Sequence, residues 1–249
     1  MMRNFQCSLV GSEVSEPTTP IQPRDILIAM YGQSNTVGQS TPDLPPNEYK
    51  EPENSFSVGS FYNGTPTLSF APLKYTVSNF GNTFGDELSM CKSLGGGYIC
   101  KIGKDGSSIQ GLTKVANDVY PQMLTLMQSA LAQKEFKKIV LRYNQWEGDS
   151  LTSTVDYVTR FKSIITDFET DTGTAIDLII VTKARATGGD AYTYIITAQN
   201  ELAIFYGDRF VMLDCDDIPR KDDFHYTGAG YITIGERVAT SIISKFNIA

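Results

Sequence analysis

Short runs of apolar residues alternate along the chain with stretches in which apolar residues recur every three or four positions. A short apolar run bounded by turn residues is typical of a strand buried on both faces, and the three-and-four spacing is typical of a helix with one apolar side. The runs predicted as strands are Ile26–Tyr31, Tyr98–Ile102, Ile139–Tyr143, Leu178–Thr182 and Phe210–Leu213. The helical pattern is clearest over Val115–Gln133, Val155–Phe168 and Thr227–Phe246.

This alternation of strands and helices predicts an α/β fold. Parallel strands joined by helices form right-handed βαβ units, which predicts a three-layer α/β/α sandwich around a parallel five-stranded sheet. In such sheets, ligands bind at the carboxyl ends of the strands. The residues that directly follow each apolar run are therefore the first candidates for a functional site.

Two segments depart from this pattern. Residues 1–24 include the stretch GSEVSEPTTPIQPR, which has little to bury, so we predict an N-terminal arm or linker before one domain over residues 25–249. Residues 41–84 combine prolines and polar residues with scattered aromatics, which predicts a long, ordered excursion. Its polar character slightly favours a sugar over a lipid as the ligand.

Composition and charge argue against several classes of protein. A net charge of −7 and a pI of about 4.8 argue against a nucleic-acid binder, which needs basic residues to neutralise phosphates. A single histidine, and cysteines without metal-ligand spacing, predict no metal site and no cofactor, and the four cysteines are interpreted as buried free thiols. No signal peptide or membrane span is apparent, which predicts a cytoplasmic protein by default, or a virion or extracellular protein that uses another route.

The candidate chemistry follows the first and the last predicted strands. The first strand runs directly into a turn that contains Ser34, although a serine in such a place is more often a helix cap than a nucleophile. His225, the only histidine, follows the last strand and stands three residues after Asp222. A serine needs an imidazole to take its proton, and the imidazole needs a carboxylate to orient it, so these residues predict a Ser34–His225–Asp222 triad. Asp223 is the rival carboxylate.

Donors for the oxyanion of an acyl-transfer intermediate are expected at two further strand ends. The segment 103–108 offers a glycine whose backbone N–H could approach a substrate oxygen, and the segment 144–149 offers amide side chains. Both would lie beside the N–H of Ser34. A turn glycine and a surface amide are the alternative interpretations.

Several stretches resemble sequence blocks of the SGNH (GDSL-like) hydrolases, in particular the branch of sialate O-acetylesterases and acetylxylan esterases, similar to carbohydrate esterase family 6. Residues 31–38, YGQSNTVG, are similar to the GQSNxxG block of that branch, and residues 145–149, QWEGD, to its QGESD block. Residues 222–237 resemble its DxxH block with the helix behind it. Between them, FGDEL at 84–88 and DGSSI at 105–109 resemble its FGPEL and GGTxI segments. The resemblance runs from about residue 25 to the C-terminus.

The resemblance implies a flavodoxin-like sandwich and a metal-independent serine esterase that removes O-acetyl groups from a carbohydrate, of the polysaccharide or sialic-acid type. It implies that Ser34 is the nucleophile, His225 the base and Asp222 the acid that orients the base. Gly106 and Gln145 would complete the oxyanion hole with the N–H of Ser34.

The QWEGD block at residues 145–149 departs from the family pattern, because Trp146 stands where the family has a small glycine. Asn144 is therefore an alternative to Gln145 as oxyanion donor. Trp146 is either a platform for a sugar ring or a core side chain. Gln33, Asn144 and Trp146 are the candidate substrate contacts, and Glu147 is interpreted as buried, hydrogen-bonded and structural.

Two other functions stay open. The same triad could hydrolyse a lipid ester or a thioester. Alternatively, the chain is a carbohydrate-binding or structural module with little turnover, attached through its N-terminal segment to a larger assembly such as a viral fibre. The linker-like start motivates this alternative, and the intact triad counts against it.

Overall fold

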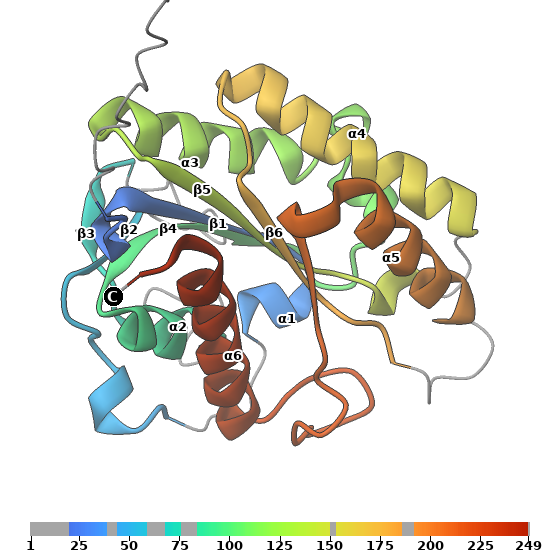
Figure 1. Cartoon of the computed structure of the whole chain (residues 1–249). Coiled ribbons are helices and arrows are strands. Elements are labelled where there is room, and N and C mark those ends of the chain that lie inside the picture. Colours follow the sequence, from blue (N-terminus) through green and yellow to red (C-terminus); the bar gives the residue numbers. More distant parts are fainter. Residues whose placement is uncertain are drawn as a thin grey trace, which may run out of the picture.

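The computed structural model describes residues 20–38, 44–58, 68–75, 84–149, 153–185 and 192–248. Within this part of the chain, seven strands form one sheet in the order β3-β2-β4-β1-β5-β6-β7 (Figure 1). The strands are β1 (Ile26–Gly32), β2 (Ser55–Val58), β3 (Phe70–Pro72), β4 (Gly97–Gly103), β5 (Lys138–Asn144), β6 (Leu178–Thr182) and β7 (Phe210–Leu213). All neighbouring pairs are parallel except β2 and β3.

The predicted α/β class and all five predicted strands are confirmed, but the predicted strand count of five is wrong. The two additional strands, β2 and β3, come from the predicted excursion over residues 41–84. They are only four and three residues long, β2 alternates polar and apolar residues, and β3 ends in Pro72 at the edge of the sheet. Proline cannot donate to a strand ladder, so such a segment does not resemble a central strand in sequence.

Helices cover both faces of the sheet and make the three predicted layers. The helices are α1 (Ser34–Val37), α2 (Glu87–Leu94), α3 (Tyr120–Gln133), α4 (Thr154–Thr172), α5 (Thr193–Tyr206) and α6 (Gly228–Phe246). Figure 1 shows α3, α4 and α5 on one face of the sheet and α2 and α6 on the other. Successive residues of β1 alternate between the two cores, with Leu27 packed under α3 to α5 and Ile28 under α2 and α6. This two-sided burial explains why the strand runs are apolar throughout.

Local capping sets the helix boundaries. α4 begins where the side chain of Ser153 accepts the N–H of Asp156, and α6 begins where Thr227 accepts the N–H of Gly230. The stretch predicted as a helix from Val115 starts with a separate short 3-10 turn, and α3 begins only at Tyr120. The observed helix boundaries therefore differ from the predicted ones by a few residues, but the predicted helices themselves are present.

The structure bears on two predictions made from composition, which concern the cysteines and a membrane-spanning helix. The described cysteines, Cys91, Cys100 and Cys215, are buried free thiols as predicted, while Cys7 lies outside the described residues. None of the described helices is both long enough and apolar enough to cross a membrane. Most of the predicted N-terminal arm also lies outside the described residues, so its boundary near residue 25 stays a prediction.

Candidate active site

The turn after β1 holds Ser34 at the carboxyl end of a central strand. β1 ends at Gly32, which lies opposite Asn144 in the register with β5. A Cβ at position 32 would lie 2.1 Å from the carbonyl oxygen of Asn144, so only glycine allows this close approach. The same carbonyl accepts the N–H of Gln33 at 3.1 Å. Gly38 then ends α1 with a φ of +92°, so the turn is fixed at both ends.

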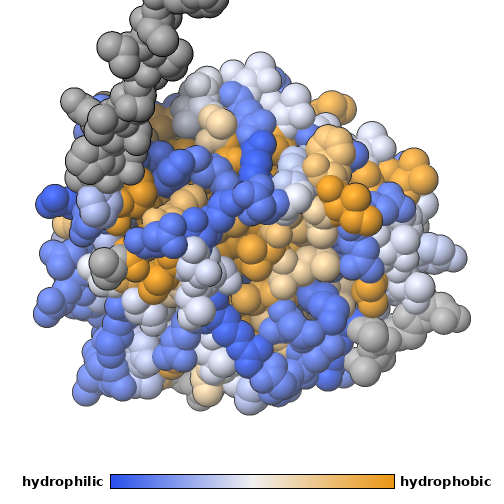
Figure 2. Space-filling view, in the orientation of Figure 1, coloured by the Kyte–Doolittle hydropathy of each residue, from blue (hydrophilic) through white to orange (hydrophobic). Residues whose placement is uncertain are grey.

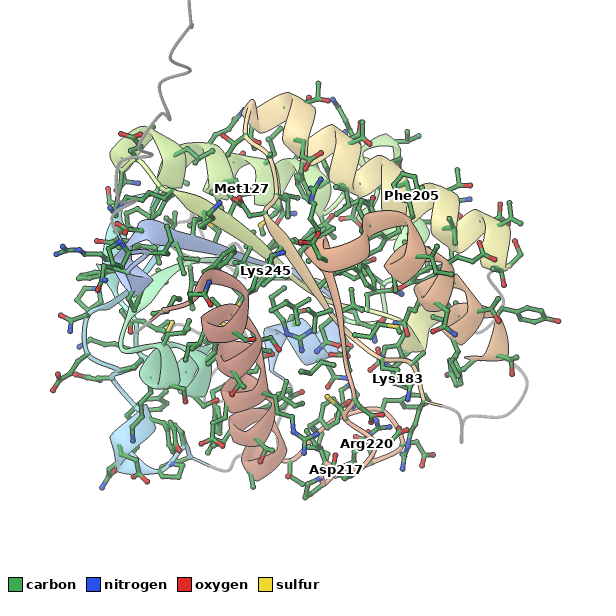
Figure 3. The ribbon with its side chains drawn as sticks, in the orientation of Figure 1. Met127, Lys183, Phe205, Asp217, Arg220 and Lys245 are labelled. Atoms are coloured by element: carbon green, nitrogen blue, oxygen red, sulfur yellow. The ribbon has the colours of Figure 1, made fainter. Side chains whose placement is uncertain are left out.

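The loop between β7 and α6 carries the other two predicted residues of the triad. Arg220 and Tyr226 form an isolated antiparallel bridge across it, and the N–H of Lys221 donates to the carbonyl of His225 at 3.0 Å. Figure 3 shows Asp217 and Arg220 on this loop, on the same side of the molecule as Lys183, which follows β6. The loop is therefore closed on itself at the end of the sheet where the parallel strands finish.

The structure brings Ser34, His225 and Asp222 together, although the serine and the histidine are 191 residues apart in the chain. The Nε2 atom of His225 lies 3.0 Å from the Oγ atom of Ser34. On the other side of the ring, Nδ1 lies 3.0 Å from each carboxylate oxygen of Asp222. Asp223 is exposed, and the ring contacts Asp222 instead.

The backbone of the loop keeps Asp222 ionised. Its Oδ1 atom accepts the N–H of Phe224 at 2.9 Å and that of His225 at 2.7 Å. Partial burial alone would raise the pKa of Asp222, but these two hydrogen bonds and the His225 ring outweigh burial and hold the pKa below its ordinary value. A carboxylate at Nδ1 favours the tautomer with its proton on that atom. Nε2 is then free to accept the hydroxyl proton of Ser34.

A buried hydrogen-bond network that the sequence did not reveal connects the two halves of the site. The side chain of Asn35 donates to the Glu147 carboxylate at 2.6 Å and to the carbonyl of Phe224 at 2.9 Å. The hydroxyl of Tyr231 donates to Asn35 Oδ1 at 2.7 Å. Asn35 follows Ser34 and Phe224 precedes His225, so the network fixes the serine turn relative to the histidine loop. The position of Asn35 inside the GQSN block is the signal that could have pointed to it.

Glu147 is buried and hydrogen-bonded, as predicted. Burial raises its pKa to about 7, although the hydrogen bonds from the backbone and from Asn35 and the charge of Arg220 act in the opposite direction. This carboxyl group is therefore neither fully ionised nor fully protonated near neutral pH.

The two amides proposed as oxyanion donors lie in different environments. The amide group of Gln145 donates to the carbonyl of Ser107 at 3.3 Å and to the carboxylate of Asp149. The amide of Gln145 thus serves two acceptors of the protein itself, whereas an oxyanion donor needs an N–H that is not already engaged. The side chain of Asn144 is buried and makes no hydrogen bond within the described part of the chain. It belongs to the last residue of β5, beside the serine turn.

The remaining three predicted site residues, Gly106, Gln33 and Trp146, differ in their exposure and their contacts. Gly106 lies in an exposed turn with a φ of +64°. Gln33 is buried, and its side-chain oxygen accepts the N–H of Gly148 at 3.2 Å. Trp146 is 2% exposed and packs edge-to-face on Tyr192 with 5.1 Å between ring centroids, which is the position of a core side chain rather than of an exposed platform.

Other features of the described residues do not contribute to this site. No three His, Cys, Asp or Glu side chains gather into a group that could hold a metal ion in the described ranges. A hollow of about 520 Å³ lies at the opposite end of the sheet, where β5, β6 and β7 begin, and its lining includes Lys138, Asp177, Arg209 and Lys245. None of the predicted site residues lines it.

Residues 24–244 match the family model described as "Carbohydrate esterase, sialic acid-specific acetylesterase". The chain belongs to this family. Membership makes it an enzyme of the carboxylic ester hydrolase class and implies an acetylated carbohydrate as the substrate. No curated protein matches the sequence.

Solved structures share the fold of this carbohydrate esterase at low sequence identity. A protein of Arabidopsis thaliana is 18% identical with a TM-score of 0.67, and the match covers 90% of this chain and all of that one. A carbohydrate acetylesterase from Xanthomonas citri is also 18% identical, with a TM-score of 0.60; the match covers 90% of this chain and 56% of that chain. A lipolytic protein of the G-D-S-L family from Veillonella parvula is 11% identical with a TM-score of 0.52, over 88% of this chain and 98% of that one. These likenesses support the SGNH-type fold.

Proposed function

We propose that this carbohydrate esterase removes O-acetyl groups from a carbohydrate by nucleophilic catalysis at Ser34. The observation that carries the proposal is the continuous contact from Ser34 Oγ to His225 Nε2 and from His225 Nδ1 to Asp222, at 3.0 Å in each step. This is the arrangement that activates a serine hydroxyl, and the family supplies the class of ester.

The reaction has two halves. In the first, His225 takes the hydroxyl proton of Ser34 while Oγ forms a bond to the acetyl carbonyl carbon. The tetrahedral intermediate then breaks its bond to the sugar oxygen, which leaves as an alcohol with the proton from His225. In the second half, His225 takes a proton from water, the hydroxide attacks the acetyl group on Ser34, and the serine leaves with the proton from His225. The product is acetic acid, which releases its remaining proton to solvent as acetate. Asp222 holds the imidazole and stabilises its cation in both halves.

The oxyanion requires donors that do not already serve other acceptors. Ser34 is the first residue of α1, and N–H groups in the first turn of a helix have no acceptor within that helix. We propose this N–H as one donor and the free amide of Asn144 as the second, in place of Gln145. The N–H of Gly106 remains a proposed third donor.

Labelling with a fluorophosphonate probe tests the nucleophile, because only an activated serine reacts with it. The wild-type chain should gain the mass of the probe on the peptide that contains Ser34, and Ser34→Ala should not. Acetate release is measured on a panel of acetylated xylo-oligosaccharides, O-acetylated sialic acid and glucose pentaacetate. Ser34→Ala should reduce it by at least about 10³-fold. A wild-type chain that is neither labelled nor active would contradict the proposal and favour the binding-module alternative. Full activity of Ser34→Ala would contradict it by showing that another group is the nucleophile.

A further inference from the structure

An aromatic side chain is exposed directly beside the proposed base. Phe224 is 44% exposed and immediately precedes His225. The described residues include other exposed large hydrophobic side chains, namely Leu44, Leu68, Val115, Val155, Tyr194, Ile204 and Phe205. Only Phe224 among them lies on the loop between β7 and α6. Consecutive Cα atoms are about 3.8 Å apart, so the ring is attached within one residue of the reacting groups.

The backbone of Phe224 is held from both sides. Its N–H donates to Asp222 Oδ1 at 2.9 Å, and its carbonyl accepts the Asn35 amide at 2.9 Å. The loop is also closed next to it by the hydrogen bond between Lys221 and His225. The phenyl ring is therefore attached to a backbone position that hydrogen bonds hold in place next to the serine turn.

Within the described part of the chain, the hydrogen bonds that hold this loop do not explain a phenyl ring at this position. Both hydrogen bonds that fix residue 224 are made by its backbone, so a polar side chain would serve the loop equally well. A half-exposed phenylalanine ring forgoes much of the stabilisation that full burial would give. A rigidly held aromatic ring can pack its face against a ligand with little further loss of conformational entropy.

We propose that Phe224 is the platform for the sugar ring of the substrate. This inference rests on the proposed function. The apolar face of an O-acetylated sugar ring would pack on Phe224 while its acetyl group lies at Ser34, so Phe224 favours sugar acetates over small esters. Trp146, the aromatic residue that the sequence had suggested for this role, is buried in the core.

The test compares two substrates in each variant. One is the acetylated sugar of the panel that the wild-type chain hydrolyses fastest, and the other is vinyl acetate, which has no ring. In Phe224→Ala the ratio of their kcat/KM values should fall about tenfold, mainly through KM for the sugar, and Phe224→Trp should restore it. Phe205→Ala is the matched control, because Phe205 is an exposed phenylalanine on α5, where hydrophobic residues reach the surface away from the loop (Figures 2 and 3). Its ratio should equal that of the wild type.

An unchanged ratio in Phe224→Ala would overturn the platform. An equal loss for both substrates would overturn it too, because it would show a displaced His225 rather than a lost sugar contact. A fall in the ratio of Phe205→Ala would show that the effect is not specific to this loop. Fluorophosphonate labelling of the wild type separates the two proposals: labelling with an unchanged ratio removes only the platform, and absence of labelling removes the proposed function.

Discussion

At the scale of single residues, two neighbouring amide side chains differ in whether they are available as hydrogen-bond donors to a substrate. Asn144 and Gln145 are adjacent, and the sequence could not decide which of them serves an oxyanion. Gln145 is occupied by the carboxylate of Asp149, four residues further along the chain, and by the carbonyl of Ser107, 38 residues before it. Among the described residues, no side chain or backbone group pairs with the amide of Asn144 at the end of β5. The choice depends on tertiary contacts, which spacing along the chain does not contain.

Asn144→Ala should therefore lower kcat on the acetylated sugar by about 10²–10³-fold, which is typical for the loss of one oxyanion donor. Steady-state kinetics measure this effect, and urea unfolding shows that the variant is folded. Gln145→Ala is the matched control. It should mainly reduce the free energy of unfolding, by about 1–3 kcal/mol, because it leaves buried acceptors unsatisfied. A normal kcat in Asn144→Ala would remove this residue from the oxyanion hole.

Glu147 should make the free energy of unfolding depend on pH, over the range between its ordinary pKa and its raised pKa in the folded protein. Its pKa rises from the ordinary 4.5 to about 7 in the folded protein, so between these values the folded state holds a proton that the unfolded state has lost. The contribution of Glu147 to the free energy of unfolding is therefore retained below pH 4.5 and falls as the pH rises towards 7. The total loss is roughly 3 kcal/mol, at about 1.4 kcal/mol per pKa unit.

Glu147→Gln keeps an acceptor for Asn35 but cannot ionise, so it should remove this loss. The free energy of unfolding, measured in urea at pH 5 and at pH 8, should shift in favour of the variant by roughly 2–3 kcal/mol between the two values. A constant difference between variant and wild type at both pH values would show that Glu147 does not titrate in this range.

At the scale of elements, the patterns that the sequence revealed are those with strong periodicity. Four of the five predicted strands are buried on both faces, and the fifth, β7, is partly buried, so all five appear as apolar runs. The helices α4 and α6 carry a clear apolar side. The rule that sites form at strand ends pointed to Ser34 and His225. β2 and β3 were missed because short strands near the edge carry little pattern. The network of Asn35, Glu147 and Tyr231 was missed because its members are polar residues whose partners only the fold brings near.

The packing of α6 on α2 depends on one glycine. A Cβ at Gly235 would lie 2.3 Å from the carbonyl oxygen of Asp86 and 2.7 Å from the N atom of Met90, and backbone atoms of a helix cannot give way easily. Gly235→Ala should therefore lower the free energy of unfolding by about 1–3 kcal/mol or more, despite the better helix propensity of alanine. Thr240→Ala, at an exposed position of the same helix, should change it by less than about 1 kcal/mol. Thermal or urea unfolding of both variants measures the difference, and equal stabilities would contradict the close packing.

At the scale of the whole molecule, the proposed active site joins the two ends of the domain. Ser34 follows β1 in the middle of the sheet, and His225 lies on the loop after β7 at its edge. Their contact spans 191 residues, so no single segment holds it. The sheet, the α2–α6 layer and the Asn35 network must all be in place for the two side chains to meet. The site is thus a property of the complete fold rather than of one motif.

Activity should consequently be lost together with the global structure in a urea titration. Trp146, the only tryptophan of the chain, is buried next to Glu147 in the QWEGD block, so its fluorescence reports on the site itself. Far-UV circular dichroism reports on the helices and strands. Because the triad depends on the sheet, the α2–α6 layer and the Asn35 network, acetate release, fluorescence and circular dichroism should share one midpoint. A fall in activity and fluorescence at lower urea than circular dichroism would show instead that the histidine loop opens locally, and that the Asn35 network is weaker than its short hydrogen bonds indicate.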